Sequence, residues 1–524
     1  FYRWAMDRIG EQGIIALITN RSFIDGMALD GFRKCIQEDF DFAYIVDTKS
    51  DVRSNPKIAG TTHNVFGIQT GVAIMILIKK NVKRAKDSVC SIHYFNMDDY
   101  WLKEKKLHWF SENKINNITF EHITPSNKNN WINLADNDFD DLLCLIDKDV
   151  KAGKVESAIF KNFSRGIATQ RDEWVYDKSE KSLDVKIKHF VNVYMKTYDN
   201  RQYEEKNSIK WDRELNKYLE RSIPKEYEKN KIISAIYRPF TKEYFYYDKH
   251  FNGMTYQWPD ILNLKDKQNK YIVIPGLSSP KEFHLLSTKY IVDLNCLPAG
   301  CQCLSYYSYD AEGNKIDNIT AWGLEQFKNY YKSKKITKED IFDYVYAVLH
   351  NTAYRKKYEL NLKREFPRIP FYEDFKKWRN WGKKLMDLHI DYESVKAFKL
   401  EVTTAKLPKS SKGKKDLFDN KYENNIKAKL KADKINGRIE LDEVTTISGI
   451  PKEAWEYKLG NRSALEWILD QYKEKKPSDP TIAEKFNTYK FADYKDQVID
   501  LLQRVTTVSV ETMKIIKEME KEIN

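Results

Sequence analysis

GIIALIT at residues 13–19, FAYIV at 42–46 and VAIMILI at 72–78 decide the fold of the first part of this chain. Each segment is a short, nearly continuous apolar run rich in β-branched residues. Such runs are typical of strands that are covered on both faces, as in a doubly wound sheet. We therefore expect residues 1–82 to belong to an α/β domain with a Rossmann-like sheet.

Helical spacing surrounds these strands. A helix is predicted from about Met27 to Glu38, and Phe1, Trp4, Ala5 and Ile9 share one face of an earlier helix. The ligand-binding loop that usually follows the first strand of such a sheet is not found ahead of the GIIALIT strand. We expect only the second half of this domain to be present here, and the first half to precede it.

Composition limits the class of protein. A length of 524 residues suggests about three or four domains, and an aromatic content of 14% is ample for large cores. The net charge of +12 is compatible with nucleic-acid binding, but a solvated surface explains it equally well. The sequence contains neither a signal peptide nor an apolar run of about 20 residues. We expect a cytoplasmic protein that does not enter the membrane.

Six cysteines are sparse for this length, which fits a reducing compartment. Cys296, Cys301 and Cys303 lie close together in the sequence, but a fourth ligand at a usual zinc-site spacing is missing. We favour buried thiols over zinc and expect no metal in this chain.

The remainder divides by pattern into three regions. Residues 83–150 are weakly patterned and are interpreted as a connecting region. Residues 151–335 are aromatic-rich and mixed, with strands predicted at 232–236, 244–247, 271–274 and 304–309. Residues 336–524 are predicted to be largely helical, with a Lys-rich exposed loop at 406–436 and a terminal helix pair at 492–522 that divides near Thr506.

The loop TTHNVFGIQTG (61–71) comes directly before the VAIMILI strand. Ligand contacts in α/β domains lie at strand ends. Phe66 is a lone ring in this polar loop, and it could stack on a flat ligand such as an extruded base or fold back into the core. Asn20 and Arg21 follow the first strand, and they either face the same crevice or cap the next helix.

Several long motifs resemble one family. GIIALITNRSFIDGMALDGFRK, YIVD and NPKIAGTTHNVFGIQTGVAIMILIKK are similar to the late motifs of gamma-class adenine-N6 DNA methyltransferases. SRGIATQRDEWVYD, IYRPFTKEYFYYD, DIFDYVYAVLHNTAYRKKY, FPRIPF, LHIDYE and LEWILDQYK resemble the C-terminal specificity region of type ISP (single-polypeptide) restriction-modification enzymes. The resemblance covers nearly the whole chain, in order.

The resemblance implies a parent enzyme that joins a nuclease, a helicase-type motor, a methyltransferase and a target-recognition domain in one polypeptide. It implies a prokaryotic protein whose partner is double-stranded DNA and whose methyl donor is S-adenosylmethionine. By this analogy Phe66, with Asn20 and Arg21, would form one wall of the pocket for the flipped adenine.

The chain also departs from the family pattern. We find no Asn/Asp-Pro-Pro-Tyr/Phe tetrapeptide, no FxGxG-type loop for S-adenosylmethionine and no GxxxxGK[ST] phosphate loop. No catalytic residue is therefore assigned to this chain, the main loop for S-adenosylmethionine is expected outside it, and the fragment alone is expected to be inactive.

Two segments, SRGIATQRD and YRPFTKEYFYYD, carry side chains suited to DNA, and the loop after the YIVI strand adds further polar candidates. Arg can fork to guanine or to a phosphate, Gln suits adenine, Asp accepts from cytosine, and Tyr hydroxyls bond phosphates. A structural alternative is that Arg171 and Asp172 pair locally while Trp174 and Tyr176 enter the core. The candidate DNA-binding residues are Arg165, Thr169, Gln170, Arg171, Asp172, Arg238, Lys242, Tyr244, Tyr246, Ser278, Ser279 and Lys281.

The sequence thus predicts a partial α/β methyltransferase sheet, followed by a mixed α+β target-recognition region with a helical C-terminal part. The expected role is sequence recognition within an enzyme that methylates adenine N6. Two alternatives remain open: a stand-alone DNA-binding specificity module without catalysis, and an RNA methyltransferase.

Overall fold

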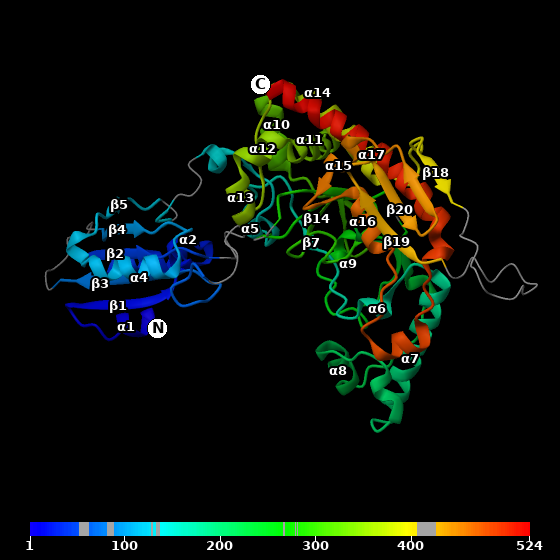
Figure 1. Ribbon diagram of the computed structural model, residues 1–524, viewed down its shortest axis with the longest axis horizontal. Helices are drawn as coiled ribbons and strands as arrows, with labels where there is room; N and C mark the ends of the chain where they lie inside the picture. The colour runs from blue at the N-terminus through cyan, green and yellow to red at the C-terminus, as the bar shows by residue number, and fades with distance from the viewer. Residues whose placement is uncertain are drawn as a thin grey trace, which may run out of the picture. The chain divides into compact units, whose positions relative to one another are not determined.

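The first unit, Phe1–Asn137, is built on a five-stranded sheet, and the second unit is Asp138–Asn524 (Figure 1). The structure is a computed structural model that describes residues 1–51, 62–80, 89–126, 129–132, 137–265, 268–277, 279, 281–405 and 426–523. The sheet of the first unit has the order β1-β3-β2-β4-β5. Its strands are β1 (Gly13–Asn20), β2 (Phe42–Asp47), β3 (Val72–Lys79), β4 (Ser91–Asn96) and β5 (Glu121–Ile123).

The three predicted strands are confirmed, but the expectation of a parallel, doubly wound sheet is not. Strand β3 runs antiparallel to both β1 and β2, and β2 pairs in parallel with β4. Strand β3 is apolar along its whole length because it lies between two other strands and both of its faces are covered at least in part. Met75 and Leu77 are fully buried, whereas Ile74 and Ile76 on the opposite face are half-buried.

Short helices complete the first unit. They are α1 (Tyr2–Met6), α2 (Ser22–Asp25), α3 (Asp30–Asp39) and α4 (Lys103–Glu112). The helix predicted from Met27 starts as a 3-10 turn, Met27–Leu29, before α3 continues it. Ile36 of α3 packs with Ile24, Ile45 and other apolar side chains in the core of this unit. Strand β1 lies at the edge of the sheet and leaves Ile14 66% exposed.

Two four-stranded sheets form the centre of the second unit. The first has the order β13-β9-β10-β8 and the second β12-β11-β14-β7. The strands predicted at 232–236, 244–247 and 271–274 are confirmed, with small shifts at their ends. The one predicted at 304–309 is divided between β14 and a separate strand, β15 (Tyr307–Tyr309), which pairs in another sheet. The strands are β7 (Ser164–Arg165), β8 (Tyr176–Asp177), β9 (Ile232–Arg238), β10 (Thr241–Tyr246), β11 (Tyr271–Ile274), β12 (Leu286–Thr288), β13 (Ile291–Val292) and β14 (Gln302–Ser305).

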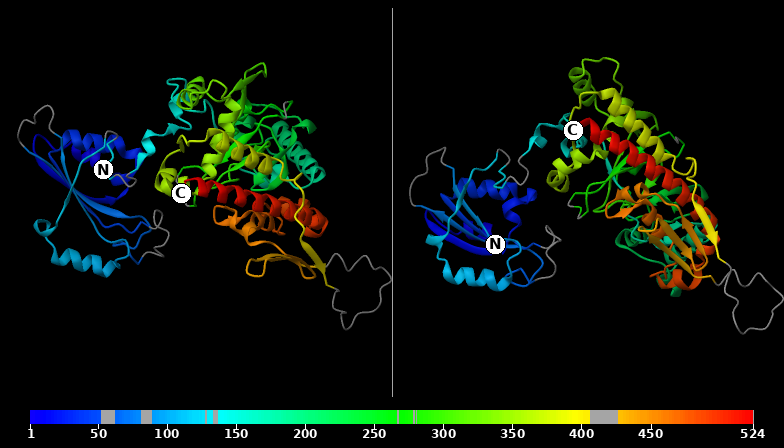
Figure 2. Two further views of the ribbon diagram at one scale, coloured as in Figure 1. Left: turned by 90° about the horizontal axis from the view of Figure 1, so that it is seen from above. Right: turned by 45° about the horizontal axis from the view of Figure 1, so that its top comes forward.

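A helical layer packs beside these sheets, formed by α11 (Lys338–His350), α14 (Phe375–Ile390) and α17 (Lys495–Ile523). Helices α11 and α14 approach so closely that a Cβ on Gly382 would lie 1.7 Å from the carbonyl oxygen of Asp343. The red α17 runs beside the yellow-green α14 in both views of Figure 2.

The terminal helix pair was a wrong prediction, because α17 is one continuous helix. Two of its polar residues, Thr506 and Ser509, are buried and bonded within the helix. The hydroxyl of Thr506 donates to Leu502 O (2.7 Å), and that of Ser509 donates to Val505 O (2.7 Å). These bonds satisfy the hydroxyls without breaking the helix.

A third four-stranded sheet occupies residues 401–448, which the sequence assigned to a mostly helical region. Its strands are β18 (Glu401–Thr404), β19 (Ala428–Asp433), β20 (Arg438–Asp442) and β21 (Thr445–Ser448). The predicted exposed loop 406–436 is therefore wrong for β19, where Leu430 is buried. Residues 406–425 of that loop lie outside the described residues.

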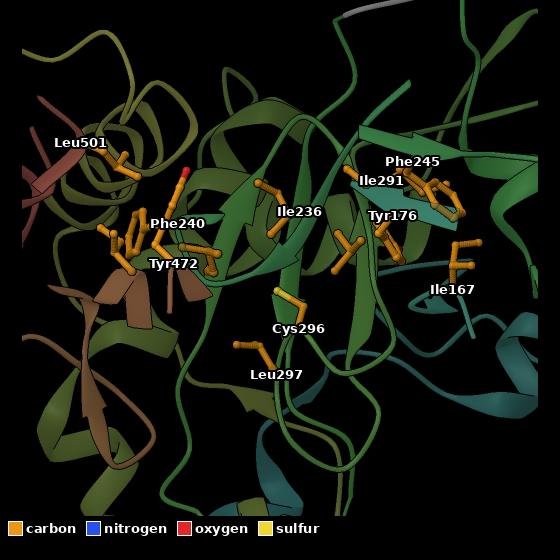
Figure 3. Packing of buried hydrophobic residues seen from close by; sticks show 14 of the residues in the cluster. Ile167, Tyr176, Ile236, Phe240, Phe245, Ile291, Cys296, Leu297, Tyr472 and Leu501 are labelled. Carbon is orange, nitrogen blue, oxygen red and sulfur yellow. The ribbon is translucent and has the colours of Figure 1, made fainter. Parts of the chain in front are cut away.

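One large hydrophobic cluster joins distant parts of the second unit. Figure 3 shows Phe240, Tyr176 and Cys296 among its members, with Tyr472 and Leu501 from the C-terminal part. Cys301 and Cys303 belong to the same cluster, and burial raises the pKa of the Cys296 and Cys303 thiols. The cysteine group is thus buried, as the sequence favours.

Candidate nucleic-acid interface

Phe66 stands on a loop that is held together from inside by Asn64. Asn64 is buried, its amide nitrogen donates to Thr70 O (2.7 Å), and its Oδ1 accepts from the backbone N–H of Phe66 (2.9 Å). Gly67 follows with φ +68°, a conformation that glycine adopts readily. The ring of Phe66 remains 57% exposed. The loop therefore presents this ring to solvent and does not fold it into the core.

Unlike the exposed ring of Phe66, the side chain of Arg21 is buried and paired inside the protein. Its Nε and Nη2 donate to Asp47 at 3.1 and 2.9 Å, while Asp25 lies 3.0 Å from Nη2. Tyr94 donates its hydroxyl to the same Asp47 carboxylate (2.9 Å). Burial opposes the charge on Arg21, but its bond to Asp47 raises the pKa further. Arg21 therefore holds the C-terminal ends of β1 and β2 together.

At the start of α2 the N-cap is Arg21, whose side chain makes no capping bond, and Asn20 forms the turn before it. The Oδ1 of Asn20 accepts from the backbone N–H of Ser22 (2.8 Å) at the start of α2. The Asn20 side chain is exposed beside the end of β1. The sequence analysis did not select Lys106. This lysine is buried, and its Nζ donates to the carbonyl oxygen of Thr48 (2.6 Å), directly after β2. Its position in a Lys-rich helical stretch gave no signal of burial.

In the second unit, the segment Thr169–Asp172 is tied down on both sides of Gln170. The hydroxyl of Thr169 donates to Asp172, and Tyr237 donates its hydroxyl to the other oxygen of that carboxylate (3.1 Å). Gln170 has φ +63°, which is uncommon for a residue with a side chain. Its side chain is exposed, so this strained position presents an amide to solvent.

Arg171 is an internal anchor of this segment. It is 1% exposed, its Nη2 lies 2.8 Å from Asp212 Oδ1, and its Nη1 donates to Phe251 O (3.0 Å). The local pair with Asp172 that the sequence offered as an alternative is replaced by this distant one. Trp174 and Tyr176 lie in the core, as that alternative stated. The Arg171 guanidinium is thus shielded from solvent and paired inside the protein.

A cavity of about 650 Å³ opens beside this segment. Asp172, Glu173 and Asp293 line it, but each carboxylate already accepts bonds from the protein. The exposed side chains of Gln170, Lys210 and Asn295 also line the cavity. The sequence did not single out Lys210 or Asn295, because they come from segments distant from the TQRD motif.

The hairpin of β9 and β10 carries four candidates with different environments. Arg238 donates to Asp293 Oδ1 (2.7 Å) and is largely buried, and Lys242 donates to Glu393 (2.6 Å) at the surface. Tyr244 is half-buried, whereas Tyr246 lies in the core and its hydroxyl accepts from the N–H of Glu228. The Tyr246 side chain therefore packs in the core and is not accessible to a ligand.

The remaining candidates lie on other loops. Arg165 is exposed and its guanidinium lies 5.9 Å from the ring of Tyr256. Ser279 is buried and its hydroxyl accepts from the N–H of Lys281 (3.2 Å), whose side chain is half-exposed. Ser278 lies outside the described residues.

Membrane-spanning helices and metal-binding clusters are both absent from the part of the chain that the structure describes. No helix there is both long and apolar enough to cross a membrane. No group of three or more His, Cys, Asp or Glu side chains in those residues is arranged to hold a metal ion.

A comparison with known families decides the relationship. The profile described as Type ISP C-terminal specificity domain matches residues 158–501, which include the TQRD segment, the β9–β10 hairpin and the three four-stranded sheets of the second unit. The chain belongs to this family. The resemblance seen in the sequence is thereby confirmed.

Three solved structures, two of them described as Type ISP restriction-modification enzymes, are also similar to the chain over 99% of its length. The DrdV–DNA complex is 41% identical with a TM-score of 0.78, and the chain covers 51% of it. LlaBIII, an ATP-dependent Type ISP enzyme bound to DNA, is 30% identical with a TM-score of 0.74 and 33% covered. A nuclease-deletion mutant of LlaGI with a DNA substrate mimic is 28% identical with a TM-score of 0.70 and 47% covered.

The chain thus spans about a third to a half of the length of these enzymes. A comparison with curated proteins gave no significant match.

Proposed function

We propose that this chain is the C-terminal part of a Type ISP restriction-modification enzyme, and that its second unit recognises a specific sequence in duplex DNA. The observation that carries the proposal is the match of the specificity-domain family over residues 158–501. The three solved structures described above are complexes with DNA or a DNA mimic, which supports the same partner for this chain. The net charge of +12 is favourable for binding a phosphate backbone.

The burial of the candidate residues narrows the proposed contact set. Gln170, Arg165 and Lys281 are accessible, and Lys242 becomes accessible if its surface pair with Glu393 opens. An exposed pair of this kind contributes little to stability, so a phosphate can replace the carboxylate at low cost. Thr169, Arg171 and Asp172 position Gln170, and we do not include them among the contacts. Tyr244 remains a candidate for a phosphate contact.

For the first unit we propose that it closes one wall of a pocket for an adenine extruded from the duplex. The exposed ring of Phe66 supports this role, because an accessible ring held on a braced loop can stack on a base. Asn20, at the end of β1, remains a proposed residue of this pocket wall. Arg21 has a supporting role, because its bond to Asp47 joins the ends of β1 and β2. The proposed reaction of the parent enzyme is methylation of adenine N6.

The residues of this chain do not fit S-adenosylmethionine. Asp47 is the carboxylate at the end of β2, and Arg21 and Tyr94 already occupy it. A glycine-rich cradle is missing from the sequence. We therefore derive no step through the methyl donor, and propose that its main binding loop lies elsewhere in the parent enzyme.

Binding of the chain to duplex DNA, single-stranded DNA and duplex RNA, each measured over a range of salt concentrations, tests the choice of partner. We expect the tightest binding to duplex DNA, with an affinity that falls as salt displaces phosphate contacts. Tighter binding to duplex RNA at every salt concentration would support the RNA alternative and overturn the proposal.

A further inference from the structure

A second, smaller cavity of about 170 Å³ lies in the second unit, away from the TQRD segment. Its walls come from α12 (Thr352–Lys357), α15 (Lys452–Glu456), α17 and the segment 282–285. Helix α17 contacts both α12 and α15, and Figure 1 labels all three helices. Arg355, His284 and Tyr457 contribute the polar groups on which the argument rests.

Arg355 brings a positive charge to this cavity without a matching carboxylate. Its Nε donates to Leu349 O (2.6 Å), and the described residues place no carboxylate oxygen within ion-pairing distance of its guanidinium. Burial lowers its pKa to about 10, so it remains charged at neutral pH. Its side chain is only partly exposed, and a guanidinium that is withdrawn in part from bulk water still favours a charged partner. The free end of the guanidinium therefore favours an anion in the cavity.

His284 and Tyr457 add two unused polar atoms. They are 2% and 4% exposed, and neither Nε2 of His284 nor the hydroxyl of Tyr457 has a hydrogen-bond partner. Nδ1 of His284 lies 2.7 Å from the carbonyl oxygen of Glu282, which can only accept, so Nδ1 carries the proton. Burial, and to a smaller extent the charge on Arg355, lowers the pKa of His284 to about 4. At neutral pH its Nε2 is therefore an acceptor, while Tyr457 offers a donor.

The other charged groups at the cavity are either paired with a group of opposite charge or exposed to solvent. Glu456 lies 3.6 Å from Lys452 and 3.5 Å from Lys517, so it is balanced by two lysines. Glu282 and Lys458 are exposed, and they contribute one charge of each sign. Glu282 is the carboxylate that could turn toward Arg355, so it serves as a test residue below.

We propose that this cavity binds a phosphate group that still carries a proton, with Arg355 and Tyr457 donating to its oxygens and Nε2 of His284 accepting its P–OH. Such a group offers both the acceptors and the single donor that the three side chains require. One water occupies about 30 Å³ of liquid volume, so the cavity has room for a tetrahedral anion with water beside it. The proposal does not depend on the recognition of duplex DNA.

Two sources supply a phosphate: inorganic phosphate, which keeps a P–OH at pH 7, and the terminal phosphate of a nucleic acid, which has a second pKa of about 6 and keeps its P–OH only at lower pH. Calorimetric titration of the 524-residue chain with inorganic phosphate at pH 7 is the first arm. Sulfate, which has no proton at this pH, is the matched anion, and we expect it to bind at least tenfold more weakly. The second arm compares a short oligonucleotide with and without a 5′-phosphate. At about pH 5.5, where the terminal phosphate keeps its proton, tighter binding of the phosphorylated than of the unphosphorylated oligonucleotide would assign the site to nucleic-acid ends, and equal binding of the two would assign it to free phosphate.

Tyr457→Phe removes only the hydroxyl and should weaken phosphate binding about tenfold, as loss of a hydrogen bond to a charged group does. Tyr176→Phe is the control, because Tyr176 also has a buried hydroxyl without a partner but lies outside this cavity. Glu282→Gln should leave binding unchanged or strengthen it.

Three results would overturn the proposal. The first is absence of saturable phosphate binding to the wild-type chain, and the second is an equal effect of the two tyrosine substitutions. The third is a loss of thermal stability in Glu282→Gln, which would identify Glu282 as the partner of Arg355.

Discussion

Replacing Arg171 with methionine separates a structural role from a role in DNA contact. The substitution removes the 2.8 Å ion pair with Asp212 and the bond to Phe251 O, at a position that is 1% exposed. Breaking a buried ion pair costs about 3–5 kcal/mol. Asp212 keeps its capping bond to the N–H of Leu215 (2.7 Å) and is partly exposed, so its charge is not left isolated. We therefore expect the lower end, about 3 kcal/mol.

The assay is denaturant unfolding followed by tryptophan fluorescence, together with duplex-DNA affinity measured on the folded variant. Lys210→Met is the matched control, because Lys210 is exposed on the same cavity and should change stability by less than about 0.5 kcal/mol. We expect Arg171→Met to lower stability and to reduce the affinity of the folded protein no more than Gln170→Ala does, because Arg171 affects DNA binding only through the position of Gln170. An unchanged unfolding midpoint with a tenfold loss of affinity would refute this reasoning and restore Arg171 as a contact.

Three further substitutions test other parts of the structure. Phe66→Ala, made in an enzyme that contains this chain, should reduce extrusion of a 2-aminopurine at the target position and leave duplex binding intact; equal losses would contradict a stacking role. Gly382→Ala should lower the free energy of unfolding by about 3 kcal/mol, because the new Cβ overlaps Asp343 O in the contact between α11 and α14, and a wild-type melting temperature would contradict that contact. Burial raises the pKa of Asp343 to about 6 from an unfolded value near 3.8, so its protonation favours the folded state below pH 3.8 and this contribution is lost as the pH rises to 6. Asp343→Asn should therefore gain stability relative to wild type between pH 4 and 6, and a difference that stays constant over this range in paired thermal melts would show that the pKa is not raised.

Strand positions could be predicted from the sequence because they depend on local apolar patterns. The segments at 13–19, 42–46 and 271–274 became β1, β2 and β11 with at most one residue added at an end. Strand direction could not be predicted in the same way, because β3 is apolar on both faces whether its neighbours are parallel or antiparallel. The sequence also did not predict that α17 is continuous, because composition does not reveal that the hydroxyls of Thr506 and Ser509 bond to the preceding turn of the helix.

The sequence predicted which segment of the chain forms the candidate site, but not which side chains of that segment are accessible or what they contact. The TQRD motif was correctly singled out as a loop, but the partner of Arg171 lies on α8 (Arg213–Glu220) at its N-cap Asp212, far along the chain. The cavity beside the motif adds Lys210 and Asn295, which only the folded chain brings there. The exposure of Phe66 likewise depends on the bonds of Asn64, a residue that the sequence gave no reason to select.

The central claim is that the chain recognises a sequence, and selection from a random duplex-DNA library tests it most directly. The 524-residue chain is incubated with the library at moderate salt, and the retained DNA is sequenced. The account predicts enrichment of one asymmetric motif of several base pairs. Retention of DNA without any enriched motif would show binding to the phosphate backbone alone and would contradict it.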